Sequence, residues 1–173
     1  ELRLSFIKDC CKSSDLLLTH GGYDMRIVVI GAGAAGTSAA LEARKVSRDA
    51  EITVINSEGF PEYSRCGLPY AVSGEIPKFE NLILHDEGWY DKFGKVKLML
   101  KTEVTEIMPA SSVLKIKHED GSAEELQYDS LIIATGSKPS TPPIQGLQKK
   151  GVFTLRVMQE AQIQMDFDFI SSS

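Results

Sequence analysis

Residues 25–46 read MRIVVIGAGAAGTSAALEARKV, a short β-branched strand followed directly by a glycine-rich turn and a helix. The expected strand covers residues 27–30, the helix covers residues 34–46, and a second strand covers residues 51–55. Apolar runs of about four or five residues, bounded by glycine or polar residues, are typical of parallel strands that are buried on both faces. The pattern therefore predicts a strand–helix–strand unit with a parallel sheet, which is an α/β fold.

Three glycines in this stretch, Gly31, Gly33 and Gly36, form the pattern GxGxxG between the strand and the helix. In this context the first glycine allows a tight turn, the second lets the backbone approach a pyrophosphate, and the third lets helix and strand pack closely. The helix N-terminus offers unpaired N–H groups and a partial positive charge to phosphates. We therefore expect a dinucleotide-binding turn, with a merely structural turn as the alternative, made of Gly31, Ala32, Gly33, Ala34, Ala35 and Gly36.

The residues after the second strand are expected to hold the ribose of the dinucleotide. A carboxylate is usual there, about 20 residues after the glycines. This chain has Asn56 at that position, followed by Ser57 and Glu58. An asparagine still donates and accepts hydrogen bonds, but its ribose contact is weaker, and neither Asn56 nor Ser57 is a basic residue that would favour a 2′-phosphate. The fingerprint alone does not choose between NAD and FAD.

The rest of the chain predicts a long connection and then a β-meander. Residues 56–93 contain two helical pieces, one near Cys66 and one over residues 86–93. Residues 131–134 are expected to be a further buried strand, and the proline-rich run after them an extended connection. Alternating segments predict four strands, with Asp120-Gly121 as a hairpin turn before the last of them: residues 95–100, 105–108, 113–118 and 124–128.

These segments predict one folded domain over residues 25–158. Met25 has the character of an initiator residue, so residues 1–24 are expected to be an extension outside the fold, and a non-native origin is left open for them. Residues 159–173 are expected to begin as a helix and to end as a frayed tail.

Composition is that of an ordinary globular protein, with 42% apolar and 25% charged residues. The net charge of -5 gives no reason to expect nucleic acid or an anionic membrane as a partner. No apolar stretch is long enough for a membrane span or a signal-peptide core, so we expect a cytoplasmic protein. The three cysteines have no CxxC spacing, so neither a disulfide framework nor a metal site is expected.

The segment EYSRCGLPYAVSGEI, residues 62–76, contains the residue most expected to do chemistry, Cys66. A thiol at the start of an apolar stretch that can become a helix lies where the helix dipole favours the thiolate, which is the form that attacks disulfides. Arg65 would add to this stabilisation if its side chain turned inward. A buried structural cysteine is the alternative.

The combination of GAGAAG, YSRCGLPY and the segment YDSLIIATGSKP resembles the CoA-disulfide reductase and NADH oxidase branch of the pyridine nucleotide-disulfide oxidoreductases, over about residues 25–158. Relatives of the glutathione reductase type carry a second cysteine where this chain has Ala71, so the chain resembles the single-cysteine branch. The resemblance implies a Rossmann-like FAD-binding domain. It adds to the expected FAD-binding residues Arg65, Val104, Ala134, Thr135 and Gly136.

The resemblance also implies a redox cycle in which NADH or NADPH passes a hydride to FAD, and FAD passes electrons to Cys66. The cysteine would alternate between a thiolate and either a mixed disulfide with CoA, for a disulfide or persulfide substrate, or a sulfenic acid, for peroxide or oxygen. Substrate contacts are implied at Ser38, Lys45 and Arg65. Glu42 and Glu62 fall in the same set but do not suit CoA phosphates, and a solvated charged face of the helix is the alternative.

The family's enzymes are much longer than this chain and form homodimers, so the resemblance implies a truncated FAD-binding domain without the nicotinamide-binding part. Three functions follow as hypotheses. The first is reduction of CoA disulfide or persulfide through Cys66, and the second is an NADH oxidase or peroxidase that uses a Cys66 sulfenic acid. The third is a non-catalytic dinucleotide-binding fragment.

Overall fold

The computed structural model describes residues 25–171, so the extension expected over residues 1–24 lies outside the described residues. Its main sheet is parallel, with strand order β3-β2-β1-β7. This confirms the expected α/β class and the parallel sheet. The four strands are β1 (Arg26–Ile30), β2 (Glu51–Ile55), β3 (Lys97–Met99) and β7 (Ser130–Ile133).

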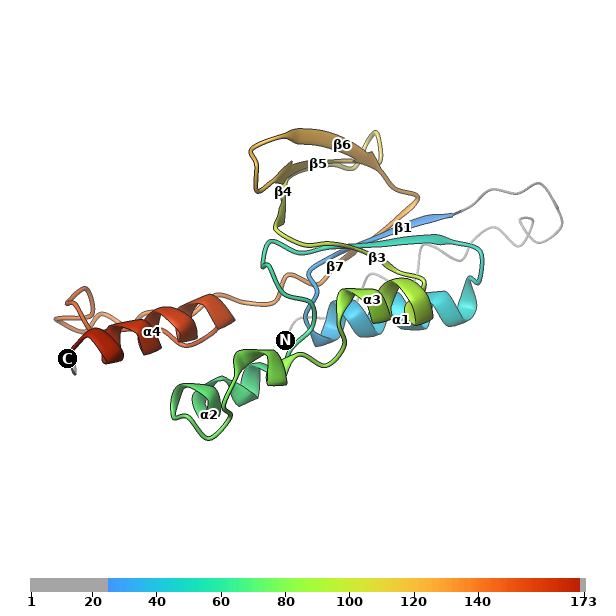
Figure 1. Cartoon of the computed structure of the whole chain (residues 1–173). Coiled ribbons are helices and arrows are strands. Elements are labelled where there is room, and N and C mark those ends of the chain that lie inside the picture. The colour runs from blue at the N-terminus through green and yellow to red at the C-terminus, as the bar shows by residue number, and fades with distance from the viewer. Residues whose placement is uncertain (1–24, 172–173) are drawn as a thin grey trace, which may run out of the picture.

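Helix α1 (Ala34–Val46) covers one face of this sheet, and Figure 1 shows the short helix α3 (Glu87–Trp89) on the same side. Alanine, leucine, glutamate, arginine and lysine make up most of α1, and these are strong helix formers. The fully buried Ala40 packs against a cluster that includes Val29 and Val54 of the strands. Small residues on this face let α1 approach the sheet closely, which fixes the position of its N-terminus.

An antiparallel meander covers the opposite face of the sheet, as Figure 1 shows. Leu114 and Ile116 are fully buried against Ile55 and the other apolar residues on that face of the sheet. The Asp120-Gly121 turn is confirmed, since Gly121 has φ +85° and Asp120 Oδ1 accepts a hydrogen bond of 2.8 Å from the Ser122 amide. The meander consists of β4 (Thr102–Met108), β5 (Val113–His118) and β6 (Ala123–Gln127).

A polar contact joins the end of the meander to the start of the parallel sheet. Arg26 Nη2 forms an ion pair of 2.9 Å with Asp129 Oδ1, and the Arg26 amide donates a hydrogen bond of 2.8 Å to Asp129 Oδ2. Arg26 Nη1 also donates to Gln127 Oε1 at 2.8 Å. The Arg26 guanidinium lowers the pKa of the Asp129 carboxyl from its ordinary value to about 2.

The strand expected over residues 95–100 was placed wrongly, because it does not belong to the meander. It is shorter, and it pairs in parallel with β2 at the end of the main sheet. Val96 and Leu98 pack on the α1 side of that sheet, and this long-range burial decides the partner strand. The next strand begins at Thr102 instead of residue 105, and its pairing with β5 is interrupted by a bulge between Val104 and Glu106.

The strand expected to be buried over residues 131–134 is β7, and its burial was overestimated. It lies at the outside of the sheet, with β1 as its single strand neighbour among the described residues. The side chain of Ile133 is accordingly exposed, at 61%. An apolar run indicates that a strand prefers burial, but it does not indicate whether another strand pairs with it on each side.

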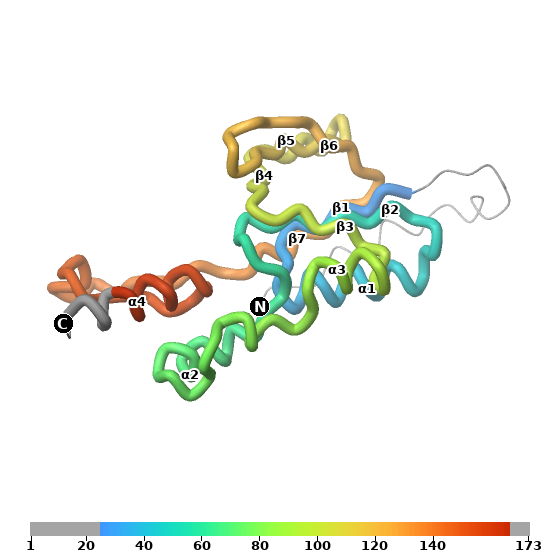
Figure 2. The backbone as a smooth tube through the Cα atoms, viewed as in Figure 1, coloured from blue at the N-terminus to red at the C-terminus, as the bar shows by residue number. Residues whose placement is uncertain are grey.

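The connection after β2 carries short helical turns that pack against the C-terminal helix. Arg65–Gly67 form a 3-10 turn that leads into α2 (Leu68–Val72), and α3 continues into a π-helical turn over Tyr90–Gly94. The helix expected beyond residue 159 is α4 (Met158–Ser171). Figure 2 follows the chain from β7 through the extended proline-rich segment to α4, whose Met158 packs with Leu68 of α2.

None of the helices described within residues 25–171 is long and apolar enough to cross a membrane.

Candidate functional site

The glycine turn has different surroundings at each of its three glycines. Gly31 has φ +106°, and a Cβ built on it would lie 2.3 Å from the Ala134 carbonyl oxygen. A Cβ on Gly36 would lie 1.9 Å from the Gly31 carbonyl oxygen and 3.3 Å from Val29 Cγ1. A Cβ on Gly33 would meet nothing within 4 Å. Two of the glycines are thus required by packing, whereas the third leaves open space at the N-terminus of α1.

This turn forms one wall of a cavity of about 400 Å³ at the carboxyl ends of β1, β2 and β7. Ligands of open α/β sheets bind at this end of the strands. Gly36 alone among the expected cofactor-binding residues does not line the cavity, because it lies behind the turn. Those that line it are Gly31, Ala32, Gly33, Ala34, Ala35, Asn56, Ser57, Glu58, Arg65, Val104, Ala134, Thr135 and Gly136.

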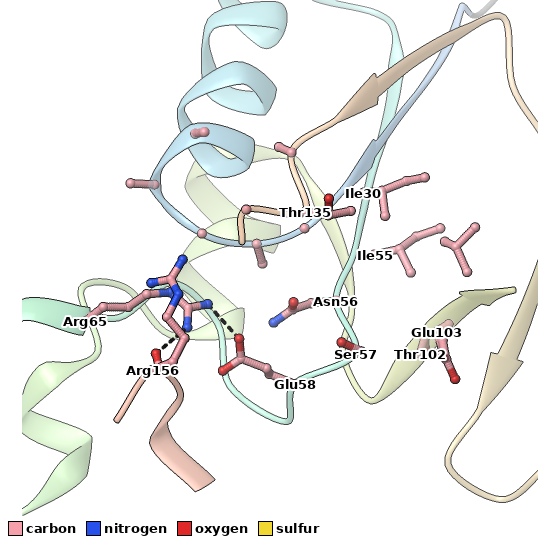
Figure 3. Close-up of a pocket in the computed structure, with 18 residues that line it drawn as sticks. Ile30, Ile55, Asn56, Ser57, Glu58, Arg65, Thr102, Glu103, Thr135 and Arg156 are labelled. Carbon is pink, nitrogen blue, oxygen red and sulfur yellow. Dashed lines mark hydrogen bonds and ion pairs between the residues drawn. The ribbon is translucent and has the colours of Figure 1, made fainter. Parts of the chain in front are cut away.

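Sequence reasoning missed several residues of the cavity wall. Ile30 and Ile55 were counted as core residues because they end buried strands, although Figure 3 shows both at one side of the cavity. Thr102 and Glu103 line it because β4 starts earlier than expected. Arg156 comes from the segment before α4, and no local pattern in the sequence connects it with the glycine turn.

Two of the three residues expected to hold a ribose, Asn56 and Glu58, form hydrogen bonds or an ion pair within the protein. Asn56 Nδ2 donates a hydrogen bond of 3.0 Å to the Phe60 carbonyl oxygen and so holds the loop after β2. Glu58 Oε1 pairs with Arg65 Nη2 at 2.6 Å, and Glu58 Oε2 accepts a hydrogen bond of 2.6 Å from the Tyr63 hydroxyl. Glu58 therefore neutralises Arg65 in the cavity wall, as the dashed line in Figure 3 indicates.

Tyr63 connects this ion pair to the start of α4. Its hydroxyl accepts hydrogen bonds of 3.0 Å from Arg65 Nη1 and from the Met158 amide. Burial, followed by the nearby Glu58 carboxylate, raises the pKa of Tyr63 above its ordinary range, so the phenol stays protonated as a donor. Arg65 Nη1 also donates to the Arg156 carbonyl oxygen at 3.0 Å. The cavity wall and the segment before α4 are thus held together by one polar network.

Cys66 is exposed, is not in a disulfide, and occupies the middle of the 3-10 turn Arg65–Gly67. It does not line the cavity itself, but it directly follows Arg65, which does. The residue after it is glycine, and a Cβ on Gly67 would lie 2.4 Å from Leu82 Cδ2, so any other residue there would have to displace that side chain. The guanidinium of Arg65, expected to support the thiolate, is paired with Glu58. The turn therefore presents the thiol to solvent beside the cavity wall.

The residues expected to bind substrate fall into two places. Ser38 and Lys45 line a separate hollow of about 320 Å³ between α1 and the helical turns that carry Trp89 and Phe93. Arg65 does not line this hollow and belongs to the cavity at the strand ends. Within the hollow Lys45 forms an ion pair with Glu42.

Glu62 lies apart from both places and holds the cysteine-bearing segment against α1. Its Oε2 accepts a hydrogen bond of 2.6 Å from Thr37 Oγ1 and one of 3.1 Å from the Tyr90 hydroxyl. Thr37 and Tyr90 are fully buried. Burial, followed by the Glu62 carboxylate, raises the pKa of Tyr90 above its ordinary range. A carboxylate with two buried donors ties the cysteine-bearing segment to α1, and the expectation that Glu62 does not suit CoA phosphates stays a prediction.

Comparison with proteins of known sequence gives one family and several named relatives. The model of the pyridine nucleotide-disulphide oxidoreductase family matches residues 25–165. An NADH oxidase of Methanocaldococcus jannaschii is 36% identical over 138 residues, which are 80% of this chain and 31% of the relative. A CoA-dependent NAD(P)H sulfur oxidoreductase of Pyrococcus furiosus is 32% identical over 136 residues, 79% of this chain and 30% of the relative.

Solved structures agree with these relatives. A NAD-dependent persulfide reductase from A. fulgidus is 36% identical, with a TM-score of 0.77 over 86% of this chain and 28% of that one. The reduced CoADR-RHD of Bacillus anthracis is 27% identical, with a TM-score of 0.81 over 87% of this chain and 28% of that one. The chain thus spans roughly a third or less of the length of these proteins. Family membership implies FAD as cofactor and NAD(P)H as electron donor. With a matching family model over most of its length and the corresponding fold around a glycine-rich turn, the chain belongs to the pyridine nucleotide-disulphide oxidoreductases.

Proposed function

We propose that this chain is the FAD-binding part of a flavoprotein that reduces CoA disulfide or CoA persulfide through Cys66. The observation that carries the proposal is an exposed, unpaired thiol that directly follows a residue of the cavity wall. Relatives with CoA-dependent sulfur oxidoreductase and persulfide reductase activity in their names support it. Because the chain covers about 30% of those relatives, the complete reaction belongs to a longer protein.

The cavity fits the dinucleotide that the family implies. Gly33 leaves open space where any other residue would place a Cβ, at the N-terminus of a helix of 13 residues. Unpaired N–H groups and the helix dipole make such a terminus suited to phosphates. The cavity volume of about 400 Å³ also lies in the range usual for ligand sites. Gly31 to Ala35 would face the diphosphate, Asn56 and Ser57 the ribose, and Ala134 to Gly136 would pass beside the nucleotide.

The chemistry proposed for Cys66 begins with the thiolate. It attacks one sulfur of CoA disulfide, so that a Cys66–CoA disulfide forms, the substrate S–S bond breaks, and CoA leaves as a thiolate. Bound FAD would supply the two electrons, taken from NAD(P)H, that return Cys66 to the thiolate and release the second CoA. Cys66 is suited to the first step because it is exposed in the 3-10 turn that leads into α2.

The hollow beside α1 is the proposed place for the remainder of the CoA molecule. Lys45 supplies a cation and Ser38 a hydroxyl, and both project from one face of α1 beside the ring of Trp89. Lys45 is already paired with Glu42, so it would contribute to phosphate binding only by changing partner. Arg65 lines the other cavity, so its position favours contact with the cofactor over contact with the substrate.

A second candidate, supported by the NADH oxidase of Methanocaldococcus jannaschii, is a peroxidase or oxidase that uses a Cys66 sulfenic acid. In that reaction the thiolate attacks peroxide, an S–O bond forms as the O–O bond breaks, and hydroxide leaves and takes up a proton from solvent to give water. Both candidates begin with attack by the Cys66 thiolate. They differ in the oxidant that Cys66 accepts.

Mass spectrometry of the 173-residue chain distinguishes these candidates. The chain is prepared with Cys10→Ser and Cys11→Ser, so that Cys66 is the remaining thiol, and is treated with CoA disulfide or with peroxide plus a sulfenic-acid trap. The proposal expects rapid formation of a Cys66–CoA disulfide that a Cys66→Ser variant does not form. Faster trapping of a sulfenic acid would favour the second candidate. A third outcome is that the chain binds FAD but its Cys66 reacts no faster than free cysteine with either oxidant. This outcome would contradict both candidates and would favour a non-catalytic dinucleotide-binding module.

The cytoplasmic location and the homodimer of the full-length protein stay predictions.

A further inference from the structure

Glu62 lies four residues before Cys66 and is in contact with two other parts of the fold. Its Oε2 accepts one hydrogen bond from Thr37 Oγ1, in the first turn of α1, and another from the Tyr90 hydroxyl, in the π-helical turn after α3. Both donors are fully buried, whereas Glu62 is partly buried. One carboxylate oxygen thus connects α1 and the π-helical turn to the cysteine-bearing segment.

The backbone of residues 62–64 is anchored to residues 82–84 and not to α1. The two stretches pair around an isolated antiparallel bridge, with amide-to-carbonyl hydrogen bonds of 2.8 and 3.0 Å on its two sides. Among the described residues, the contact from Thr37 to Glu62 is the single hydrogen bond that joins α1 to residues 57–84. Of the polar contacts, this one therefore decides where the cysteine-bearing segment lies relative to α1.

Thr37 extends this contact to the glycine turn. Its amide donates a hydrogen bond of 3.0 Å to the Gly33 carbonyl oxygen, and its hydroxyl lies 3.1 Å from the same oxygen. The first turn of α1 contains no acidic residue, so Glu62 brings from another segment the negative charge that a helix N-terminus favours. The cysteine-bearing segment is thus anchored at the end of α1 where Gly33 lines the cavity.

A thiol that exchanges electrons with a bound cofactor must be held in place, since a misplacement of about 1 Å can slow a reaction by about a hundredfold. Glu62 does not line the cavity, so it acts on Cys66 only through the backbone between them. We infer that Glu62 is a positioning residue that, through Thr37, sets the place of the Cys66 thiol relative to the dinucleotide cavity; this rests on the proposed FAD site and on the proposed role of Cys66.

Absorbance of the FAD-loaded 173-residue chain tests this role, in the background of Cys10→Ser and Cys11→Ser. A thiolate that lies against an oxidised flavin gives a charge-transfer band at wavelengths beyond the flavin's own absorbance. In alkaline buffer the parent should show this band, and Cys66→Ser should abolish it. Thr37→Val keeps a similar side-chain shape without the donor, and we expect it to lose most of the band at saturating FAD.

Three further variants separate the hydrogen bond from general effects on the fold. Thr37→Ser keeps the hydroxyl and should restore the band. Glu62→Ala should lose the band with α1 intact, because the Thr37 hydroxyl then turns to the Gly33 carbonyl oxygen. Thr105→Val is the matched control: it removes a hydroxyl that donates 3.2 Å to the Lys115 carbonyl oxygen in the meander, and it should show the band of the parent.

Hydrogen exchange without ligand gives a second readout that needs no FAD. Loss of a hydrogen bond to a carboxylate should speed exchange at residues 62–68 in Thr37→Val by about tenfold or more and leave β1 and β2 unchanged. Equal exchange in that variant and the parent would overturn the inference. So would a Cys66-dependent band of equal strength in the parent, Thr37→Val and Glu62→Ala, which would leave the proposed function intact. A parent that binds no FAD, or binds it without this band, would overturn both.

Discussion

The glycine turn offers a perturbation that separates ligand binding from packing. Gly33→Ala adds a methyl group where nothing lies within 4 Å, at φ -80° and ψ 178°, a backbone conformation open to any residue. Gly36→Ala adds the same group 1.9 Å from the Gly31 carbonyl oxygen. The first change is therefore expected to obstruct the approach of a diphosphate in an intact fold, and the second to force α1 away from the turn.

The size of the packing effect follows from these distances. A carbon atom and a carbonyl oxygen approach to about 3.3 Å, so Gly36→Ala must displace α1 by more than about 1 Å. Overpacking costs about 1–3 kcal/mol, and a backbone contact favours the upper end; the helix propensity of alanine offsets about 1 kcal/mol of it. The remaining loss of about 2 kcal/mol lowers the melting temperature by about 4–8 °C in a chain of this size.

The effect of Gly33→Ala on stability is expected to be smaller. Alanine is a poorer N-cap residue than glycine, but it also restricts the unfolded chain, and the two effects oppose each other. The free energy of unfolding should change by less than about 0.5 kcal/mol. Binding of FAD, in contrast, should weaken by about tenfold or more, because the new methyl group faces the phosphates.

Thermal melts without ligand and FAD titrations followed by flavin fluorescence measure both quantities in the same three proteins. We expect Gly33→Ala to melt with the parent and to bind FAD poorly, and Gly36→Ala to melt at a clearly lower temperature. FAD affinity equal to that of the parent in Gly33→Ala would refute the placement of the diphosphate at Gly33. An unchanged melting temperature in Gly36→Ala would refute the packing assigned to Gly36.

Acid should weaken the link between the meander and β1, because the Arg26 guanidinium lowers the pKa of Asp129 from 3.8 to about 2. The Arg26–Asp129 ion pair therefore stabilises the fold above pH 3.8, and this stabilisation is lost as the pH falls toward 2. Asp129→Asn should flatten that part of a pH–stability curve; an identical curve would contradict it. Met158→Ala should cost about 2–5 kcal/mol in urea unfolding, and less than 1 kcal/mol would exclude a tight α2–α4 contact. Tyr90→Phe should cost about 0.5–1.5 kcal/mol by losing its bond to Glu62; no loss would make that bond dispensable.

Local sequence signals predicted the elements around the glycine turn well. The expected helix over residues 34–46 and the strands over residues 51–55 and 113–118 have the bounds that the structure shows. Apolar periodicity and glycine punctuation are properties of adjacent residues, so they can be read without knowledge of the fold. The strand that pairs with β3 could not be predicted from adjacent residues, because the pairing depends on the burial of Val96 and Leu98 under α1.

The candidate site divides in the same way. The residues of the glycine turn and of the segment after β7 were predicted because each group is contiguous in sequence, and all of them except Gly36 line the same cavity. The pairing of Arg65 with Glu58 was not predicted, since it depends on how the loop after β2 folds back. Arg156 was missed because it reaches the cavity only through the docking of α4 against α2.

The outer position of β7 has a consequence for handling the chain. Its outward main-chain N–H and C=O groups have no strand partner among the described residues, and the exposed Ile133 adds an apolar side chain there. A bare β-edge is a template onto which another polypeptide adds as a strand. Light scattering of the purified chain should therefore show concentration-dependent self-association, and Ile133→Lys should suppress it by placing a charge on that edge.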